Sequence, residues 1–320
     1  MHKNNGMEHK ILILGASGQI GTELTLKLRQ IYGNSSVIAS DIRNGNFEVM
    51  RSGQFEILDA SNKNDILEVV KKHDIKEVYL LVAMLSFISE KNPQKAWELN
   101  MNTLFNVLEL AKEKYIDKVF WPSSIAVFGP SSPKIKTPQV TVMDPSTVYG
   151  ISKLAGENWC AYYHNKFGVD VRTLRYPGII SYKTNPGGGT TDYAVEIFYG
   201  ALQTGTYQSF LKKDTTLPMM YMEDAVDATV KLMEHEPFDS YTAYNLAAIS
   251  FSPEEIALEI KKSLPDFDIT YKKDPRQKIA NSWPYSIDDS QARKDWGWEH
   301  KFDLEKMVKV MLEGLQFIIR

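Results

Sequence analysis

Short apolar runs alternate with longer stretches of helical periodicity through the first half of the chain. The short runs predict strands, and the longer stretches predict amphipathic helices. Strands are predicted at residues 10–14, 36–40, 54–58, 77–83, 117–123 and 169–175, and helices at 19–31, 63–73, 93–114 and 150–167. This alternation is typical of an α/β fold in which a doubly wound parallel sheet carries helices on both faces.

The pattern changes beyond about Pro177, where glycine, proline and threonine become frequent. Helices are predicted near 192–203, 223–234, 253–263 and 303–318, and strands near 207–211, 242–246 and 268–272. We therefore expect a main domain over residues 10–177 and a smaller α/β substrate-binding cap mainly over 178–320. Some segments beyond 220 are expected to return to the main sheet. Residues 1–9 lack the apolar core of a signal peptide and are predicted to be a disordered leader.

A glycine motif, Gly15-Ala-Ser-Gly-Gln-Ile-Gly21, joins the first predicted strand to the first helix. Gly15 permits a tight turn, Gly18 lets a pyrophosphate approach the backbone, and Gly21 lets the helix pack closely on the strand. Asp41 ends the second strand, where a carboxylate binds both ribose hydroxyls and favours NAD over NADP; Arg43 lies close enough to weaken that preference. The alternative is an ordinary turn followed by a strand-capping Asp41. The order of strand, turn, helix and acid favours a Rossmann NAD site.

Ligands in such sheets bind beyond the carboxyl ends of the strands. Asp59 follows the third strand, where it could accept a hydrogen bond from an adenine amino group, although a turn-capping role is nearly as good an explanation. Ser86 follows the fourth strand, beside the expected nicotinamide. Ser124 follows the fifth, where it could share a substrate hydroxyl with Tyr149. A Ser-Ser pair is also common in turns, so a catalytic role for Ser124 gains weight only from Tyr149 and Lys153.

Tyr149 and Lys153 are four residues apart in a predicted helix, so their side chains share one face. An ammonium beside a phenol stabilises phenolate and is expected to bring the tyrosine pKa from about 10 toward neutrality. A phenol that exchanges a proton near pH 7 suits alcohol–carbonyl chemistry. Exposed helices carry such pairs by chance, so the pair gains weight only from the glycine motif and Ser124.

Composition excludes several other classes of protein. The chain of 320 residues has a net charge of −3, which offers no basic field for nucleic acid. No apolar stretch approaches the length of a membrane span. The single cysteine, Cys160, rules out an internal disulfide and suits a reducing compartment, so we expect a cytoplasmic protein. No cluster of His, Cys and carboxylates has metal-ligand spacing, and no metal is expected.

With these motifs, the chain resembles the extended short-chain dehydrogenase/reductase superfamily of nucleotide-sugar epimerases and dehydratases. Within it, the chain is most similar to the short-chain type of L-threonine 3-dehydrogenases. The motifs that carry this closer resemblance are Ala83-Met-Leu-Ser86, Arg175-Tyr-Pro-Gly178, Pro186-Gly-Gly-Gly-Thr-Thr-Asp-Tyr193, Leu217-Pro-Met-Met-Tyr221 and Asn281-Ser-Trp-Pro-Tyr285. Phe128 departs from the tyrosine that sugar epimerases usually carry at this position, which argues against nucleotide-sugar chemistry.

The resemblance implies a set of site residues. Tyr149 would be the general base, Lys153 would hold the nicotinamide ribose, and Ser124 would complete the catalytic set. The residues expected to bind the cofactor are Gly15, Gly18, Gln19, Ile20, Gly21, Asp41, Asp59, Ala60, Val82, Ala83, Asn100, Tyr149, Lys153, Tyr176, Pro177 and Ile179. Those expected to contact the substrate are Ser86, Ser124, Tyr149, Gly189, Thr190, Thr191 and Trp283.

The expected reaction is NAD-dependent oxidation of L-threonine at C3 to 2-amino-3-oxobutanoate, a step of threonine catabolism. The backbone N–H groups of residues 187–190 could form a nest for the substrate carboxylate, with a flexible hinge as the alternative. Residues 177–206 hold one basic residue, Lys183, which is too few for a diphosphate. The competing functions are an NDP-sugar epimerase or dehydratase and, more remotely, a non-catalytic NAD(P)-binding redox sensor.

The helices near 101–114 and 150–167 carry more apolar and aromatic residues than one sheet face requires. Relatives pair these helices between subunits in a four-helix bundle, so the resemblance implies a homodimer. The alternative is that the sheet and a loop cover all of these side chains.

Overall fold

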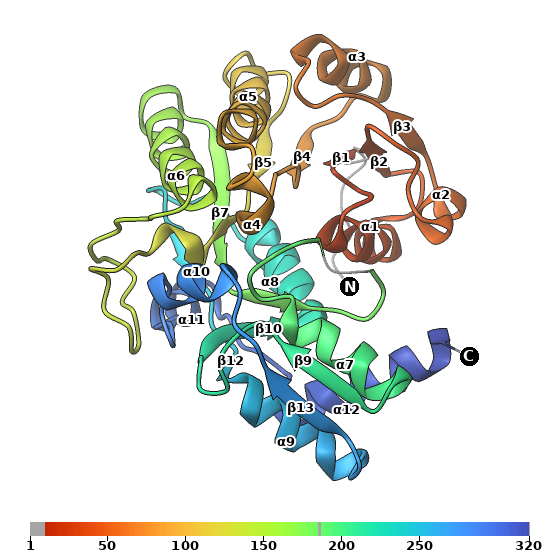
Figure 1. Ribbon diagram of the computed structural model, residues 1–320. Helices are drawn as coiled ribbons and strands as arrows, with labels where there is room; N and C mark the ends of the chain where they lie inside the picture. The colour runs from red at the N-terminus through yellow and green to blue at the C-terminus, as the bar shows by residue number, and fades with distance from the viewer. Residues whose placement is uncertain (1–9, 185–186, 320) are drawn as a thin grey trace.

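The computed structural model describes residues 10–184 and 187–319. A large parallel sheet forms its centre (Figure 1). Its strands, in spatial order, are β11 (Ala243–Asn245), β7 (Asp170–Tyr176), β5 (Lys118–Phe120), β4 (Glu77–Leu80), β1 (Ile11–Leu14), β2 (Val37–Asp41) and β3 (Phe55–Ile57), with β6 (Ser123–Ser124) beside β7. The order reverses between β1 and β4, the position at which doubly wound sheets bind ligands. The predicted α/β class is confirmed.

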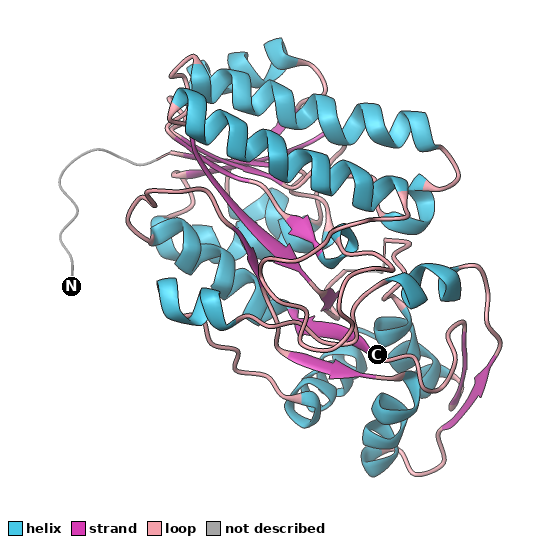
Figure 2. Ribbon diagram, turned by 90° about the vertical axis from the view of Figure 1, so that its left-hand side faces the viewer, coloured by secondary structure: helices cyan, strands magenta, loops and turns pink. Residues whose placement is uncertain are grey.

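Helices cover both faces of this sheet because its central strands are apolar on both sides. In β1, Ile11 and Ile13 belong to one buried cluster, whereas Leu12 and Leu14 belong to another. This division follows from the two-residue repeat of a strand. The first cluster packs against α1 (Gln19–Tyr32), α8 (Met222–Glu234) and α11 (Ser290–Trp296), and the second against α3 (Lys63–His73), α5 (Pro93–Lys112) and α6 (Val148–Phe167). Figure 2 views the molecule from the flank on which α5 and α6 lie.

A second layer of smaller sheets lies below the carboxyl ends of the main strands in Figure 1. Its elements are β8 (Gly178–Ile180), β10 (Leu217–Tyr221) and β12 (Ile249–Phe251) in one sheet, and β9 (Thr206–Ser209) and β13 (Asp268–Tyr271) in another. The helices α7 (Tyr193–Gln203), α9 (Pro253–Ser263) and α12 (Leu304–Ile319) share one core with these sheets. The short helices α2 (Phe47–Ser52), α4 (Ser86–Ser89) and α10 (Arg276–Ser282) complete the fold.

Three elements from beyond residue 220 pack with the main sheet. Strand β11 pairs in parallel with β7, and α8 and α11 belong to the core that contains β1. The chain therefore crosses between the two layers more than once. None of the helices within residues 10–184 and 187–319 combines the length and the apolar character that a membrane span requires.

The long predicted helices match the observed ones within a few residues, but several short elements were not predicted from the sequence. Strands β8 and β12 have three residues each, too few to display a period. Strand β10 contains Pro218, which argues against a strand in sequence-based assignment. The predicted fourth strand ends early, at Leu80, and the predicted fifth is divided into β5, which ends at Phe120, and β6. Leu81 and Pro122, which follow these ends, line a cavity described next.

Candidate active site

The glycine turn brings the N-terminus of α1 to the carboxyl end of β1. Gly15 has a φ of +91°, which favours glycine, and the backbone nitrogens of Gly15 and Ala16 both donate to Ser40 O at 2.9 Å. A Cβ on Gly21 would lie 2.1 Å from Gly15 O, so any side chain there would push the helix away from the turn. Free N–H groups at the helix start can therefore face an anion beside Gly18.

A cavity of about 450 Å³ runs along this turn. Asp41 lines it, and its carboxylate accepts the backbone N–H of Ser17 at 3.1 Å and that of Ile42 at 2.9 Å. Arg43 lines the same space. Asp59 caps a turn by accepting the N–H of Ser61 at 2.8 Å, and it also lines the cavity, so the adenine role predicted for it stays a prediction. The dimensions and the placed carboxylate fit the adenosine half of a dinucleotide.

A second cavity of about 150 Å³ adjoins the first, and both are lined by Leu81 and Ala83. Tyr149 and Lys153 face it from the first turns of α6, whose N-cap is Thr147. Ser124 reaches it from β6, where its hydroxyl accepts the N–H of Ala126 at 3.2 Å and is also hydrogen-bonded to Tyr149. The three residues predicted to be catalytic therefore line one cavity.

Lys153 is deeply buried, with 3% of its surface exposed. Its Nζ donates to Pro122 O at 2.6 Å, lies 4.5 Å from the ring centroid of Trp121 and 5.6 Å from that of Tyr149. Burial lowers the pKa of Lys153 to about 7 and raises the pKa of Tyr149 to about 12, against a lowering effect of the Ser124 hydrogen bond. The predicted fall of the tyrosine pKa toward neutrality is therefore wrong for this arrangement, because burial outweighs the lowering effect of the Ser124 hydrogen bond.

The glycine-threonine segment closes the other side of the cavity. The backbone nitrogens of Gly188 and Gly189 donate to Asp192 Oδ2 at 2.8 and 2.7 Å, so the chain's own carboxylate occupies the predicted nest. Burial raises the pKa of Asp192 to about 6. Thr190 Oγ1 lies 3.2 Å from Ser86 Oγ, which links this segment to the start of α4.

Asp192 lines the cavity but was not among the predicted site residues. The sequence signal that could have found it is its place at the start of the helix predicted at 192–203. A helix start favours an acidic residue, but it does not show which groups will donate hydrogen bonds to the carboxylate.

Three predicted cofactor residues lie outside both cavities. Gly21 packs against the turn as described above. Asn100 is buried, and its side chain holds the backbone of Met84. It accepts the N–H of Met84 at 2.8 Å and donates to Met84 O at 3.3 Å. Pro177 is buried between the cavity residues Tyr176 and Gly178.

The other predicted residues all line one cavity or both. Those in the larger cavity are Gly15, Gly18, Asp41, Asp59, Ala60, Val82 and Ala83. Those in the smaller cavity are Gln19, Ile20, Ala83, Ser86, Ser124, Tyr149, Lys153, Tyr176, Ile179, Gly189, Thr190, Thr191 and Trp283. Within the described parts of the chain, no three His, Cys, Asp or Glu side chains form a metal-binding group.

Comparisons with known proteins agree with this geometry. Residues 11–247 match the model of the NAD dependent epimerase/dehydratase family. The chain is 49% identical over 311 residues to an uncharacterized epimerase/dehydratase of Staphylococcus aureus, covering 96% of this chain and 97% of the relative.

Two solved structures are similar over nearly the whole chain. A GalE-like L-threonine dehydrogenase from Cupriavidus necator in its holo form has a TM-score of 0.93 and 53% identity, covering 96% of this chain and 99% of that one. An L-threonine dehydrogenase from Clostridium difficile has a TM-score of 0.94 and 52% identity, covering 97% and 98%. The resemblance found in the sequence is thereby confirmed, and the chain belongs to the NAD-dependent epimerase/dehydratase family and takes NAD as its cofactor.

Proposed function

We propose that the protein is an NAD-dependent L-threonine 3-dehydrogenase, which oxidises the substrate hydroxyl at C3 to give 2-amino-3-oxobutanoate. The observation that carries this proposal is the smaller cavity, where Ser124 and Tyr149 face a single carboxylate, Asp192. Among the described residues that line it, Lys153 is the only basic side chain. A nucleoside diphosphate requires several converging basic groups, whereas a small zwitterion does not. The dehydrogenase structures similar to this chain support the same conclusion.

The catalytic residues have separate tasks in this proposal. The Ser124 hydroxyl orients the substrate oxygen, and Tyr149 takes its proton as the general base. The chemistry that NAD supplies when bound is acceptance of the C3 hydride. Because a phenolate and an ammonium attract each other, loss of the Tyr149 proton favours a protonated Lys153, and the two groups titrate as a pair. Lys153 in its charged form would therefore stabilise the phenolate that the reaction requires, against the rise in the Tyr149 pKa that burial causes.

The charges of the zwitterion meet complementary groups in the same cavity. The ionised Asp192 carboxylate is suited to the substrate ammonium, because two backbone N–H groups fix its direction. The hydroxyls of Ser86, Thr190 and Thr191 line the same cavity and can donate to the substrate carboxylate. This assignment replaces the backbone nest expected from the sequence.

The proposal is tested by following NADH formation with L-threonine, L-allo-threonine and L-serine, in parallel with product analysis for a panel of UDP- and dTDP-sugars. We expect turnover of L-threonine and none of the sugar nucleotides. Epimerised or dehydrated sugar without threonine oxidation would instead support the second function, which the family name and the S. aureus relative keep in view. NAD binding without turnover of any compound would support the redox sensor.

We also propose that the enzyme is a cytoplasmic homodimer. The outer surfaces of α5 and α6 expose Trp97, Ile151, Trp159 and Tyr162, each by 40% or more. The ring of Phe105 on α5 lies 5.0 Å from that of Trp159, so the aromatic residues of the two helices form a continuous patch. A patch of this kind is typical of a subunit interface. The single buried cysteine suits a reducing compartment.

A further inference from the structure

Glu157 lies on the same face of α6 as Tyr149 and Lys153, one turn beyond the lysine. It is 4% exposed and lines neither cavity. Its Oε1 accepts the Ser123 hydroxyl at 2.5 Å and Arg175 Nε at 2.9 Å, and its Oε2 accepts Arg175 Nη2 at 2.8 Å. Desolvating such an ion pair is costly, and replacing it by apolar residues often leaves stability unchanged, so stability alone is a weak reason for its presence.

The strand register connects this ion pair to the catalytic cavity. In the pairing of β6 with β7, Ser123 lies opposite Arg175 and Ser124 lies opposite Tyr176. Ser123 and Arg175 are bound to Glu157, whereas Ser124 and Tyr176 line the cavity, which Ser123 also borders. The position of the Ser124 hydroxyl is therefore set by residues that are bound to Glu157.

Helix α6 is attached to the segment before Ser124 at two consecutive residues. Lys153 Nζ donates to Pro122 O at 2.6 Å, and one turn later Glu157 accepts the hydroxyl of Ser123 at 2.5 Å. Two such bonds fix both the distance and the rotation of that segment relative to α6. These two bonds add to the pairing of β6 with β7 and to the Ala126 N–H in holding Ser124 beside the phenol.

Arg175 is itself held on its other side. Its Nη1 donates to Asn245 Oδ1 and to Gln139 O, each at 3.1 Å. Asn245 Nδ2 in turn donates to Thr137 O at 3.3 Å and to Asp288 O at 3.1 Å. Because Glu157, Arg175 and Asn245 are all buried and joined by these bonds, the carboxylate of Glu157 has little freedom to move.

We propose that Glu157 is a positioning residue for the dehydrogenase reaction: it holds Ser124 against Tyr149 through Ser123, and its charge, balanced by Arg175, favours the positively charged form of Lys153. This inference rests on the proposed function, in which Tyr149 and Lys153 act as a pair. Glu157 touches neither substrate nor cofactor cavity and acts only through its neighbours.

The surroundings of Lys153 give this charge its influence. The titratable or charged groups around it are Tyr149, Glu157 and Cys160 on α6, Arg175 and Tyr176 on β7, Tyr241 before β11, and Asp192 across the cavity. Burial lowers the pKa of Lys153, while Cys160 and Glu157 oppose this. Burial raises the pKa of the Cys160 thiol well above its usual value, so that group is neutral and Glu157 supplies the negative charge on this helix.

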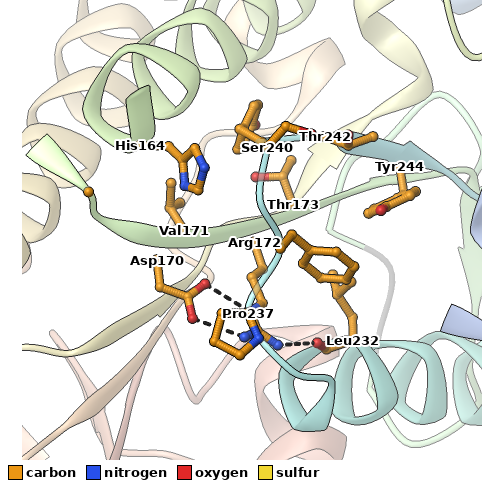
Figure 3. Close-up of a pocket in the computed structure, with 13 residues that line it drawn as sticks. His164, Asp170, Val171, Arg172, Thr173, Leu232, Pro237, Ser240, Thr242 and Tyr244 are labelled. Carbon is orange, nitrogen blue, oxygen red and sulfur yellow. Dashed lines mark hydrogen bonds and ion pairs between the residues drawn. The ribbon is translucent and has the colours of Figure 1, made fainter. Parts of the chain in front are cut away.

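The test compares Glu157→Gln and Arg175→Met with a matched control, Arg172→Met. Arg172 lies on the same strand and is equally buried, but it binds Asp170 and the carbonyls of Leu232, Met233 and His235 beside a separate cavity at the opposite end of β7 (Figure 3). The variants are labelled with [ε-¹³C]lysine, and the Lys153 signal is assigned by its loss in Lys153→Met. Its titration is then followed by NMR together with kcat and KM for threonine.

We expect Glu157→Gln to lower the Lys153 titration midpoint by about one pH unit, because it removes the negative charge and leaves the positive one. Arg175→Met is expected to raise the midpoint, and Arg172→Met to leave it unchanged. Glu157→Gln should also lower kcat roughly tenfold with little change in KM, since orientation acts on the chemical step. Equal midpoints in all three variants, or shifts of the same sign in Glu157→Gln and Arg175→Met, would overturn the proposal.

The titration keeps this proposal separate from the function on which it rests. A wild-type protein that oxidises no threonine would remove the proposed function, whereas the Lys153 midpoints would still show whether Glu157 and Arg175 set the charge of the lysine. Turnover of threonine with unchanged midpoints would instead retain the dehydrogenase and reject the role of Glu157.

Discussion

The carboxylate of Asp192 accepts the backbone N–H of Gly189 at 2.7 Å, at the point where the glycine-threonine segment meets the catalytic cavity. Burial raises the pKa of Asp192 to about 6. If the ionised form binds the substrate ammonium, kcat/KM falls as the pH decreases through about 6, because protonation removes the charge. Asp192→Asn should raise the KM for threonine by about tenfold or more, as expected for loss of a charge-assisted hydrogen bond.

The matched control for this prediction is Glu196→Gln, one turn further along α7. Glu196 accepts the hydroxyl of Tyr207 at 3.0 Å and does not line the cavity. Steady-state kinetics between pH 5 and 8, roughly the range around the Asp192 pKa, should show the acidic decline in this control and not in Asp192→Asn. A decline that persists in Asp192→Asn would assign it to another group.

Tyr149→Phe should retain NAD binding and lower kcat by about a hundredfold or more, because it removes the proton acceptor and leaves the ring in place. Calorimetric titration with NAD measures the binding, and NADH formation measures turnover. Ser124→Ala serves as the comparison, with a smaller loss expected because the phenol remains. Wild-type turnover by Tyr149→Phe would show that another group takes the proton.

Lys153→Met should stabilise the protein while it abolishes activity. Burial lowers the lysine pKa from its ordinary value of 10.5 to about 7. Below pH 7, Lys153 is protonated in both the folded and the unfolded chain, so the folded state bears the full desolvation cost of the charge. As the pH rises from 7 to 10.5, Lys153 is neutral in the folded chain but still protonated in the unfolded chain, and the destabilisation decreases progressively to zero. The gain in unfolding free energy is expected to be roughly 2–5 kcal/mol below pH 7 and to vanish above pH 10.

Thermal unfolding at pH 6 and pH 10, compared with the exposed Lys166→Met on the same helix, measures this difference. The control should change the melting temperature little at either pH. A Lys153→Met variant that is less stable than the wild type at pH 6 would mean that the bond to Pro122 O outweighs the desolvation cost.

The structure shows which features of the fold and site the sequence could predict and which it could not. The glycine turn and the long helices depend on residues that are close in sequence, and they lie where they were expected. The pKa of Tyr149 and the partner of Asp192 depend on burial and on loops that meet only in the fold. Pattern analysis placed Ser124 correctly beside the cavity, but it could not predict that Glu157 holds the neighbouring residue.

Asp41 should set the preference for NAD over NADP. Its carboxylate is fixed by the N–H groups of Ser17 and Ile42 in the lining of the larger cavity, where it would repel a 2′-phosphate. Asp41→Ala is expected to change the ratio of kcat/KM for the two cofactors by roughly tenfold or more toward NADP, with Arg43 available to the added phosphate. Asp59→Asn, which alters another acid in the same cavity, should leave the ratio unchanged. An unchanged ratio in Asp41→Ala would remove the residue from this role.

The aromatic patch on α5 and α6 predicts an association that a single charge should disrupt. Trp159 is 40% exposed, and its ring packs edge-on against Phe105 and Tyr162. Trp159→Glu would place a carboxylate in the middle of a desolvated interface, where an unpaired charge is strongly unfavourable. Light scattering at micromolar concentration should give a dimer for the wild type and a monomer for this variant.

The control for the interface is Leu258→Glu on α9, which changes a side chain that is 60% exposed on a different helix. Because isolated exposed apolar residues need no partner, this variant should remain a dimer with unchanged activity. A monomeric wild type would show that the patch is solvated. If Leu258→Glu alone dissociated the dimer, the interface would lie on α9, and the role of α5 and α6 would be limited to covering the sheet.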